Sequence, residues 1–545
     1  MNSPPAATPF SLAWQALAEH AALLRPRHLR ELFAEAPDRF LALSLTLSGK
    51  EGSLLLDFSK QRITAETLSL LHNLARAAAV ESWRDRMAAG ETINHTEGRA
   101  AMHMALRAKE GNSAIAREVA SNLARMKALC AALHSRQWRG MSGEYITDVV
   151  NLGIGGSDLG PRMATRALAA FQHPDIRVHF AANIDGADLA PLLARLNPRS
   201  TFFIVTSKTF TTEETITNAR AARDWLSAHL PGGESEKTLL ARHFIAVTSN
   251  RAAAETFGIP SGQIFTFSDW AGGRFSLWSP VGLAIALATG FSNFEALLAG
   301  AHALDQHFLT APLPENLPIT LALMYVWNVN FIGAASHAII PYSQSLELFP
   351  AYLQQLEMES LGKSVDRQGL PLAHKSCPII WGSPGTLGQH SFSQLLHQGG
   401  QPIPCDFILL EHADFPLPGH HARLVANALA QSAALAFGQT LAEAKAADIP
   451  DSLLPYRVFP GNQPSTTLLL ERLTPYTLGQ LLALYEHKVF AVGALWNLNI
   501  FDQWGVELGK NMAKKLQPFL EAEAHLSDND GLDASTRGLI AAFTK

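Results

Sequence analysis

The sequence predicts an α/β fold of two domains, each with a parallel-rich sheet covered by helices. Its 545 residues exceed what one hydrophobic core usually organises, so at least two domains are expected. Short apolar segments alternate with helical patterns within residues 145–258 and again within residues 333–413. This alternation predicts parallel sheets with helices on both faces. The two ends of the chain show mainly helical periodicity, apart from a strand-like segment at residues 52–61.

Four units of strand, turn and helix follow one another in the first alternating region, and their strands are expected near residues 145, 177, 200 and 243. A Gly-rich turn at residues 272–291 leads into an apolar helix, and we place a domain boundary near it. The second region repeats the pattern, which suggests an old duplication. We expect a mainly helical segment packing on the large domain (1–115), a smaller α/β domain (116–285), a larger α/β domain (286–510) and a C-terminal helical arm (511–545).

Composition and charge exclude several classes of function. A net charge of −5 gives no indication of the positively charged surface that binds nucleic acid or an anionic membrane. Residues 319–335 are the most apolar segment, but two asparagines interrupt it, so a buried helix is expected. The amino-terminal segment lacks the basic start of a signal peptide, and three cysteines in so long a chain fit a reducing compartment. We expect a soluble, cytoplasmic protein without nucleic-acid or membrane partners.

The first candidate binding loop is "GIGGSDLG", residues 153–160, which follows a predicted strand. Its glycines allow close approach of a ligand, and Ser157 offers a hydroxyl near a helix start, where an anion is favoured. The glycine spacing is not that of a dinucleotide-binding fingerprint, and a tight turn would also explain it.

The second candidate loop is "TSKTFTTEET", residues 206–215, which contains six hydroxyl side chains and Lys208 directly after an apolar strand. Hydroxyls and backbone amides at a helix start can form a phosphate-binding cradle. A helix cap with a capping-box glutamate is the alternative, although one hydroxyl would suffice for it. Because both loops follow strands of one predicted sheet, they can converge on a single phosphate.

Other positions carry groups suited to acid–base chemistry or to charge stabilisation. Arg274 follows a flexible Gly pair and could stabilise an oxyanion, although a surface ion pair is the alternative. His390 follows a predicted strand, which suits an acid or base, but the chain has 21 histidines. Glu357 and Glu359 lie two apart on a predicted helix, so periodicity allows either to face inward. No His or Cys cluster has standard metal-ligand spacing, and no metal site is expected.

Seven segments together resemble the glucose-6-phosphate isomerase (phosphoglucose isomerase) family. In chain order they are "NHTEGRAAMHMALR", "NLGIGGSDLGP", "TSKTFTTEET", "DWAGGRFSLWSPVG", "MES", "GQHSF" and "GALWNLNIFDQWGVELGK". The resemblance covers nearly the whole chain. It implies two αβα sandwich domains of the sugar isomerase type with helical additions, and a homodimer whose C-terminal arms embrace the partner. It also implies reversible interconversion of glucose 6-phosphate and fructose 6-phosphate, without a metal or organic cofactor.

The same resemblance implies roles for individual residues. Glu359 would move a proton between C1 and C2, and Arg274 would stabilise the cis-enediolate intermediate. His390 and Lys510 would assist opening of the sugar ring. Glu357 would be an ordinary helix charge. The positions implied to bind phosphate or to line the pocket are Gly156, Ser157, Ser207, Lys208, Thr209, Thr212, Glu214, Gly273 and Gln503.

Two positions depart from the commonest family pattern, because Leu361 and Leu387 stand where asparagine is usual. Since a buried asparagine without its partner is costly, we expect the two leucines to be spatial neighbours that replace a polar pair.

Three alternatives remain for the function. The first is a broader hexose-phosphate isomerase that also uses mannose 6-phosphate, and the second is a non-catalytic sugar-phosphate sensor. The third, a nicotinamide-dependent dehydrogenase, lacks its fingerprint.

Overall fold

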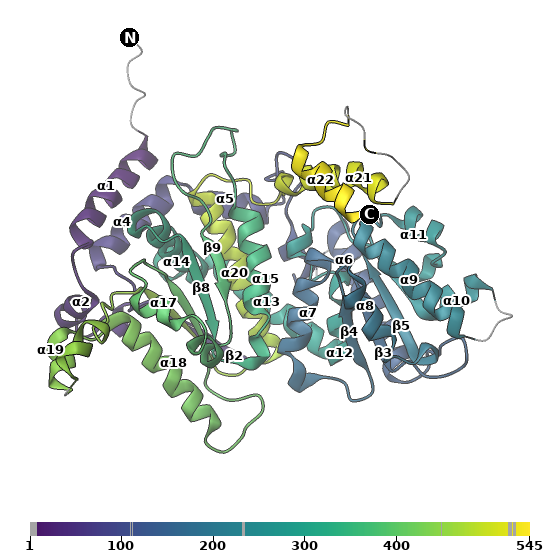
Figure 1. The fold of residues 1–545 in the computed structure, drawn as a ribbon, viewed down its shortest axis with the longest axis horizontal. Coiled ribbons are helices and arrows are strands. Elements are labelled where there is room, and N and C mark those ends of the chain that lie inside the picture. Colours follow the sequence, from purple (N-terminus) through teal and green to yellow (C-terminus); the bar gives the residue numbers. More distant parts are fainter. Residues whose placement is uncertain are drawn as a thin grey trace, which may run out of the picture. The chain divides into compact units, whose positions relative to one another are not determined.

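The computed structural model describes residues 8–108, 111, 113–230, 235–447, 449–521, 526 and 530–544. The chain forms two compact units, Met1–Ile500 and Phe501–Lys545. The larger unit contains two sheets with their helices, and the smaller contains α21 (Glu507–Leu520) and α22 (Ala534–Phe543) (Figure 1). Within these ranges every helix is too short or too polar to span a bilayer.

The five-stranded sheet is entirely parallel and confirms the first predicted alternating region. Its strands are β3 (Asp148–Leu152), β4 (Arg177–Ala181), β5 (Thr201–Thr206), β6 (Phe244–Val247) and β7 (Ile264–Phe265), in the spatial order β4-β3-β5-β6-β7. Every residue of β3, β5 and β6 is buried, as expected for strands with helices on both faces. Alternate residues such as Val150, Phe203 and Phe244 share a core with the helices on one face. The helices around this sheet are α6 (Ala114–His134), α7 (Leu159–Ala167), α8 (Gly186–Leu193), α9 (Glu213–His229), α10 (Glu236–His243), α11 (Arg251–Phe257) and α12 (Leu283–Thr289).

The six-stranded sheet is mixed. Its strands are β1 (Ser44–Gly49), β2 (Gly52–Asp57), β8 (Ser336–Pro341), β9 (Ile379–Gly382), β10 (Cys405–Leu410) and β11 (Ser465–Leu470), in the order β1-β2-β11-β10-β8-β9. β8 to β11 are parallel, whereas β2 runs antiparallel to β11 and to β1. The strand-like segment predicted near the amino terminus is therefore β2, one half of a hairpin that extends the second sheet. In both sheets the first parallel strand lies between the second and the third, which supports the duplication.

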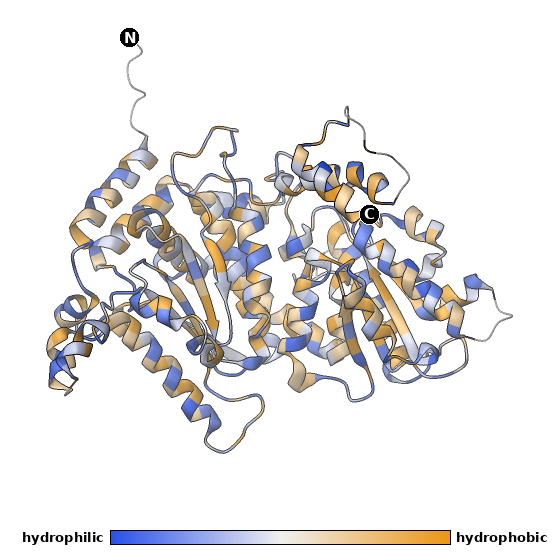
Figure 2. Ribbon diagram, viewed as in Figure 1, coloured by the Kyte–Doolittle hydropathy of each residue, from blue (hydrophilic) through white to orange (hydrophobic). Residues whose placement is uncertain are grey.

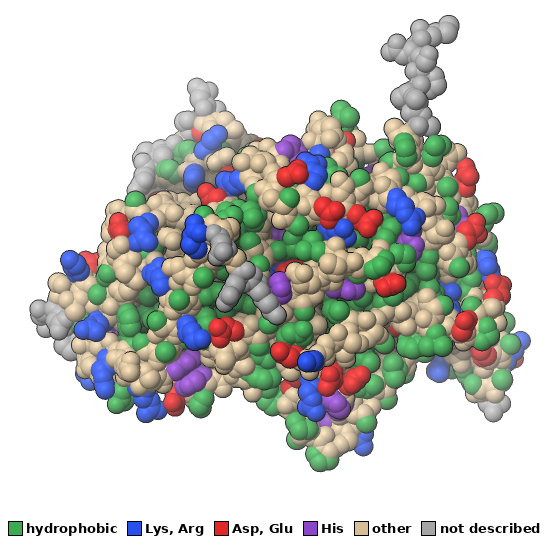
Figure 3. Space-filling view, turned by 180° about the vertical axis from the view of Figure 1, so that it is seen from behind, with side chains coloured by type: hydrophobic (Ala, Val, Ile, Leu, Met, Phe, Trp, Pro, Cys, Tyr) green, Lys and Arg blue, Asp and Glu red, His purple; other side chains and the backbone are tan. Residues whose placement is uncertain are grey.

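Helices surround this second sheet, and hydrophilic and hydrophobic residues alternate along them (Figure 2). The predicted apolar segment covers most of the buried helix α14 (Leu317–Val326) and the whole of a π-helix at Trp327–Ile332. A second π-helix, Gln354–Glu359, continues α15 (Phe349–Leu353). On the face in Figure 3, side chains of both charge signs are interspersed with apolar ones. The remaining α-helices of the larger unit are α1 (Pro9–Leu24), α2 (Leu29–Glu35), α3 (Arg39–Ala42), α4 (Ala65–Ala77), α5 (Val80–Ala88), α13 (Phe291–Thr310), α14 (Leu317–Val326), α15 (Phe349–Leu353), α16 (Gly385–Gln389), α17 (Ser393–Gln398), α18 (His420–Phe437), α19 (Leu441–Ala446) and α20 (Pro475–Leu495).

Helix α20 is buried along its whole length except at Tyr476, although its middle reads Tyr-Glu-His-Lys. Each of these four polar side chains binds a different element. The Tyr485 hydroxyl donates to Asp406 at 2.8 Å, and the ammonium of Lys488 donates to Glu357 at 2.8 Å. Buried polar groups need such partners, so α20 fixes the elements around it.

The other two side chains of this row, Glu486 and His487, belong to one buried ionic cluster. Arg107 pairs with Asp305 and with Glu486, each at 2.6 Å, and His487 bonds to Asp305 at 2.6 Å. The indole of Trp278 donates to Glu486 at 2.8 Å. Burial alone would raise the pKa of Asp305, but the Arg107 guanidinium holds it at about 2. Asp305 is therefore an anion inside the core, whereas burial raises the pKa of Glu486 against the opposing effect of Arg107.

We predict that Arg107→Met lowers the free energy of unfolding by about 3–5 kcal/mol, because it leaves two carboxylates buried without their cation. Urea titration followed by circular dichroism measures the loss. Arg199→Met is the matched control: its pair with Glu144 lies at the surface at 3.3 Å, so its loss should stay below about 1 kcal/mol. Equal losses in the two variants would contradict the prediction.

Candidate functional site

Both loops singled out in the sequence lie at the carboxyl edge of the five-stranded sheet. β3 and β5 are neighbours, with Leu152 paired to Val205, so the loops that follow them emerge side by side. The strand order also reverses here, because β4 lies on one side of β3 and β5 on the other. A crevice at such a switch point is where open α/β sheets bind ligands.

The hydroxyl-rich loop is organised by its own side chains. The hydroxyls of Ser207 and Thr212 lie 2.9 Å apart, and Ser207 also accepts from the backbone N–H of Phe210 at 3.1 Å. Thr211 donates to Thr209 at 2.8 Å. Thr212 precedes α9, but its side chain accepts no hydrogen bond from the first turn. The alternative of a simple helix cap is therefore wrong, and the start of α9 suits an anion. Glu214 lies half-buried in its first turn.

Asn151 joins the two loops, and the sequence analysis missed it. It is fully buried in β3, where its amide donates to the backbone oxygen of Ser157 at 3.0 Å. Its own oxygen accepts from the Thr206 hydroxyl at 3.0 Å. An amide within the otherwise apolar run of β3 was the available signal, since a buried amide needs such partners.

A third loop, residues 269–280, carries Arg274 and packs against the first. A Cβ on Gly156 would overlap the backbone oxygen of Gly273 and would lie 2.8 Å from the backbone nitrogen of Arg274. The Lys208 ammonium also reaches this third loop and donates to the backbone oxygen of Asp269 at 3.2 Å. Burial lowers the pKa of Lys208, and the carboxylate of Asp269 partly opposes this shift. The structure thus brings all three predicted loops together.

Arg274 is buried and held from two sides. Its Nε donates to the Ser360 hydroxyl at 2.7 Å, and its Nη2 donates to the backbone oxygen of Ile500. Its Nη1 lies 3.8 Å from a carboxylate oxygen of Glu359. The alternative of a surface ion pair is therefore wrong, because the guanidinium lies within the core and faces a carboxylate.

The structure distinguishes the two glutamates. The Glu359 side chain is 22% exposed and faces Arg274, whereas Glu357 is fully buried against Lys488. The expectation that Glu357 is an ordinary helix charge was wrong. Both residues lie on the π-helix Gln354–Glu359, whose i→i+5 hydrogen bonds shift the phase of its faces. For that reason 3.6-residue periodicity left the two glutamates undistinguished.

His390 follows α16, directly beyond β9, and its side chain is exposed. In the described part of the chain, no hydrogen bond or ion pair joins it to Glu359 or Arg274. Lys510 and Gln503 belong to the smaller unit, where Lys510 pairs with Glu507 at 3.9 Å. The parts that His390, Lys510 and Gln503 play at the site are therefore left to the proposed function.

The two unusual leucines do not have the burial of a packed pair. Leu361 is fully buried just beyond the π-helix, whereas Leu387 on α16 is 58% exposed. The expectation of a compensating apolar pair is therefore not supported, because only Leu361 lies in the core.

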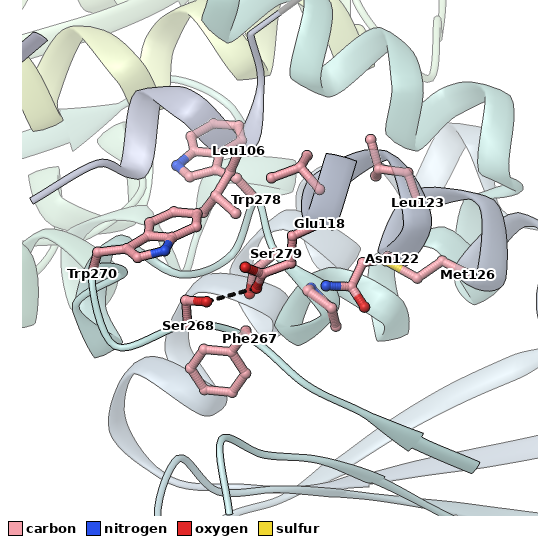
Figure 4. A pocket seen from close by; sticks show the side chains of 12 residues that line it. Leu106, Glu118, Asn122, Leu123, Met126, Phe267, Ser268, Trp270, Trp278 and Ser279 are labelled. Carbon is pink, nitrogen blue, oxygen red and sulfur yellow. Dashed lines mark hydrogen bonds between the residues drawn. The ribbon is translucent and has the colours of Figure 1, made fainter. Parts of the chain in front are cut away.

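A small cavity of about 10 Å³ lies behind the Arg274 loop, between that loop and α6 (Figure 4). Asn122 and Met126 of α6 line it together with Trp270 and Trp278, and Ser268 donates to Glu118 at 2.6 Å. A volume this small admits no sugar phosphate. The cavity therefore marks the support of the loop and is separate from the binding crevice.

Known proteins of one family resemble the chain over nearly its whole length. The family model described as phosphoglucose isomerase matches residues 57–540. A glucose-6-phosphate isomerase of Dechloromonas aromatica is 62% identical over 533 residues, covering 98% of this chain and 99% of the relative. One of Methylococcus capsulatus is 47% identical, covering 97% and 98%. The crystal structure of a glucose-6-phosphate isomerase from Chlamydia trachomatis is similar with a TM-score of 0.83 at 32% identity, covering 98% of both chains.

We predict that Gly156→Ala lowers the melting temperature, because the new methyl group forces the Gly273 backbone away. Gly273→Ala is the matched control, since no atom lies within 4 Å of a Cβ built there. Differential scanning calorimetry compares the variants. If Gly156→Ala melted as Gly273→Ala does, the two loops would not touch in solution.

Asp158 gives the site a pH dependence of stability. Burial raises the pKa of this carboxyl to about 6 from its usual 3.8, although Arg162 opposes the shift. Because the pKa of Asp158 is higher in the folded state than in the unfolded state, its contribution to stability is greatest below pH 4. That contribution is lost as pH rises through 6. By linkage the loss is about 3 kcal/mol.

Asp158→Asn should therefore gain free energy of unfolding relative to the wild type between pH 4 and pH 6, with a constant difference above pH 7. Urea titrations of both proteins across this range measure the difference, in which other titrating groups cancel. A difference that does not change with pH would contradict the assignment.

Proposed function

The chain belongs to the phosphoglucose isomerase family and interconverts glucose 6-phosphate and fructose 6-phosphate, and from this premise we propose how its residues divide the reaction. The observation that carries the proposal is the pairing of an accessible carboxylate, Glu359, with a buried guanidinium, Arg274, beside a hydroxyl-rich loop at a sheet switch point.

We propose that the phosphate binds between the loops after β3 and β5. The start of α9, the clustered hydroxyls and the close approach of the glycines support this placement. Neutral hydroxyls and amides can hold a dianion while leaving the nearby acid–base groups undisturbed. The residues proposed to bind it are Ser157, Ser207, Lys208, Thr209 and Thr212, with Gly156 and Gly273 at points of close approach.

Glu359 is proposed as the base that removes a proton from C2 of the open-chain aldose and returns it to C1. Removal of that proton leaves a cis-enediolate with negative charge on its oxygens. Arg274 is proposed to stabilise this charge, since its guanidinium is fixed by Ser360 and by the Ile500 carbonyl before substrate arrives. Preorganised donors of this kind need no reorientation in the transition state.

His390 and Lys510 are proposed to transfer protons during opening of the ring, and Gln503 and Glu214 to line the pocket.

We also propose a cytoplasmic homodimer in which residues 511–545 form an arm around the partner. Exposed apolar side chains on α16, α17 and the segment before α18 support a partner surface near His390, because such patches are usually covered; they are Leu387, Leu395, Phe415 and Leu417. The proposed domain limits remain 1–115, 116–285, 286–510 and 511–545.

We predict that Glu359→Gln lowers kcat by on the order of 10³-fold, because the amide cannot accept the carbon-bound proton. Formation of glucose 6-phosphate from fructose 6-phosphate, detected with a coupled dehydrogenase, measures the rate. Exchange of the transferred hydrogen with deuterated water should fall in parallel. Glu213→Gln, an exposed glutamate on α9, is the control.

An active Glu359→Gln variant would refute the assignment of the base. The same assay with mannose 6-phosphate tests whether the site accepts the epimer at C2. A folded wild type that binds fructose 6-phosphate without converting it would favour the sugar-phosphate sensor.

A further inference from the structure

We propose that the buried ion pair between Glu357 and Lys488 is a positioning pair, which fixes the π-helix so that Glu359 faces Arg274. The two groups lie 2.8 Å apart, and neither side chain is exposed to solvent. Glu357 therefore cannot reach a substrate, and it would act only through Glu359. The inference rests on the proposed role of Glu359.

Lys488 is a rigid anchor because of its surroundings. It lies near the centre of the buried helix α20, and its ammonium lies 4.2 Å from the ring centroid of Tyr325 and 5.0 Å from that of Tyr485. Aromatic faces attract a cation, and this attraction is strongest where water is absent. Tyr485 is itself held by Asp406. The ammonium thus has little freedom to follow a displaced carboxylate.

The π-helix needs such an anchor more than an α-helix would. Helices of this type are rare and short, so their backbone depends on tertiary contacts. Gln354 donates to the backbone oxygen of Ile380 at 3.1 Å, and Ser360 accepts from Arg274. Glu357 lies between these two contacts and adds a third, its buried ion pair with Lys488. Three fixed points across seven residues determine where Glu359 projects.

The distance between Glu359 and Arg274 shows what depends on this placement. At 3.8 Å the two groups are not directly hydrogen-bonded, so their contact does not itself lock the carboxylate. The position of Glu359 must come from its backbone. Displacement of a catalytic group by about 1 Å can cost on the order of 100-fold in rate.

The test measures kcat, KM and melting temperature for Glu357→Gln, with fructose 6-phosphate as substrate. We expect kcat to fall about 10- to 100-fold while KM changes less than about threefold, because the phosphate loops are untouched. Asp148→Asn is the control for loss of a buried carboxylate. Its partners Arg177 and His179 lie at the opposite edge of the first sheet, so it should lower melting temperature and leave kcat within about twofold.

A second variant separates positioning from stability. Glu357→Met with Lys488→Met removes both charges at similar volume, which often restores stability. Positioning predicts that kcat stays low even if the melting temperature recovers. A kcat within about twofold of the wild type in Glu357→Gln, or in the double variant if Glu357→Gln does not fold, overturns the proposal. Failure of both to fold also overturns it, because the pair would then serve folding itself.

Glu359→Gln, assayed alongside, tells the two proposals apart. If Glu359→Gln is inactive and Glu357→Gln is fully active, only the positioning role fails. If Glu359→Gln is active, the role of Glu359 fails and the positioning role fails with it.

Discussion

Four polar side chains in a row, Tyr485 to Lys488, cross the core of the larger unit, where water cannot satisfy them. Each finds its partner on a separate part of the chain: β10, the cluster around Arg107, α13 and the π-helix. Consecutive residues of a helix point in different directions, so these four side chains contact elements on different sides of α20. The Arg274 loop joins through Trp278, and the helix thereby holds the two elements that bear Arg274 and Glu359.

The crevice itself is built differently from this core. Most contacts between its loops are backbone contacts and neutral hydrogen bonds, such as the glycine approach at Gly156, the amide of Asn151 and the hydroxyls around Ser207. The Lys208 ammonium adds one charged contact, and the charges of Glu359 and Arg274 lie where the chemistry is proposed. A neutral cradle beside a charged centre suits a substrate whose phosphate must be held but does not react.

The sequence predicted what is encoded locally. Central strands such as β5 and β6 are short apolar runs, and the two binding loops have unusual composition, so these features could be identified from the sequence. The hairpin partner of β2 and the amide bridge of Asn151 depend on contacts across the fold. Periodicity left the orientation of Glu357 and Glu359 open for a different reason, because a π-helix has no signature in the 3.6-residue pattern. For the expected pairing of Leu361 with Leu387, the fold shows that the two side chains differ in depth, since Leu361 is buried and Leu387 is exposed, and sequence alone does not predict such depth.

The matching strand order of the two sheets has an evolutionary consequence. The loops proposed to bind phosphate follow β3 and β5 of one sheet, whereas Glu359 and His390 follow β8 and β9 of the other. If the halves arose by duplication, one copy kept the anchoring of the ligand and the other acquired the acid–base groups. Selection could then adjust affinity in one half and turnover in the other with little interference, which gives the enzyme two separately adjustable parts within one polypeptide.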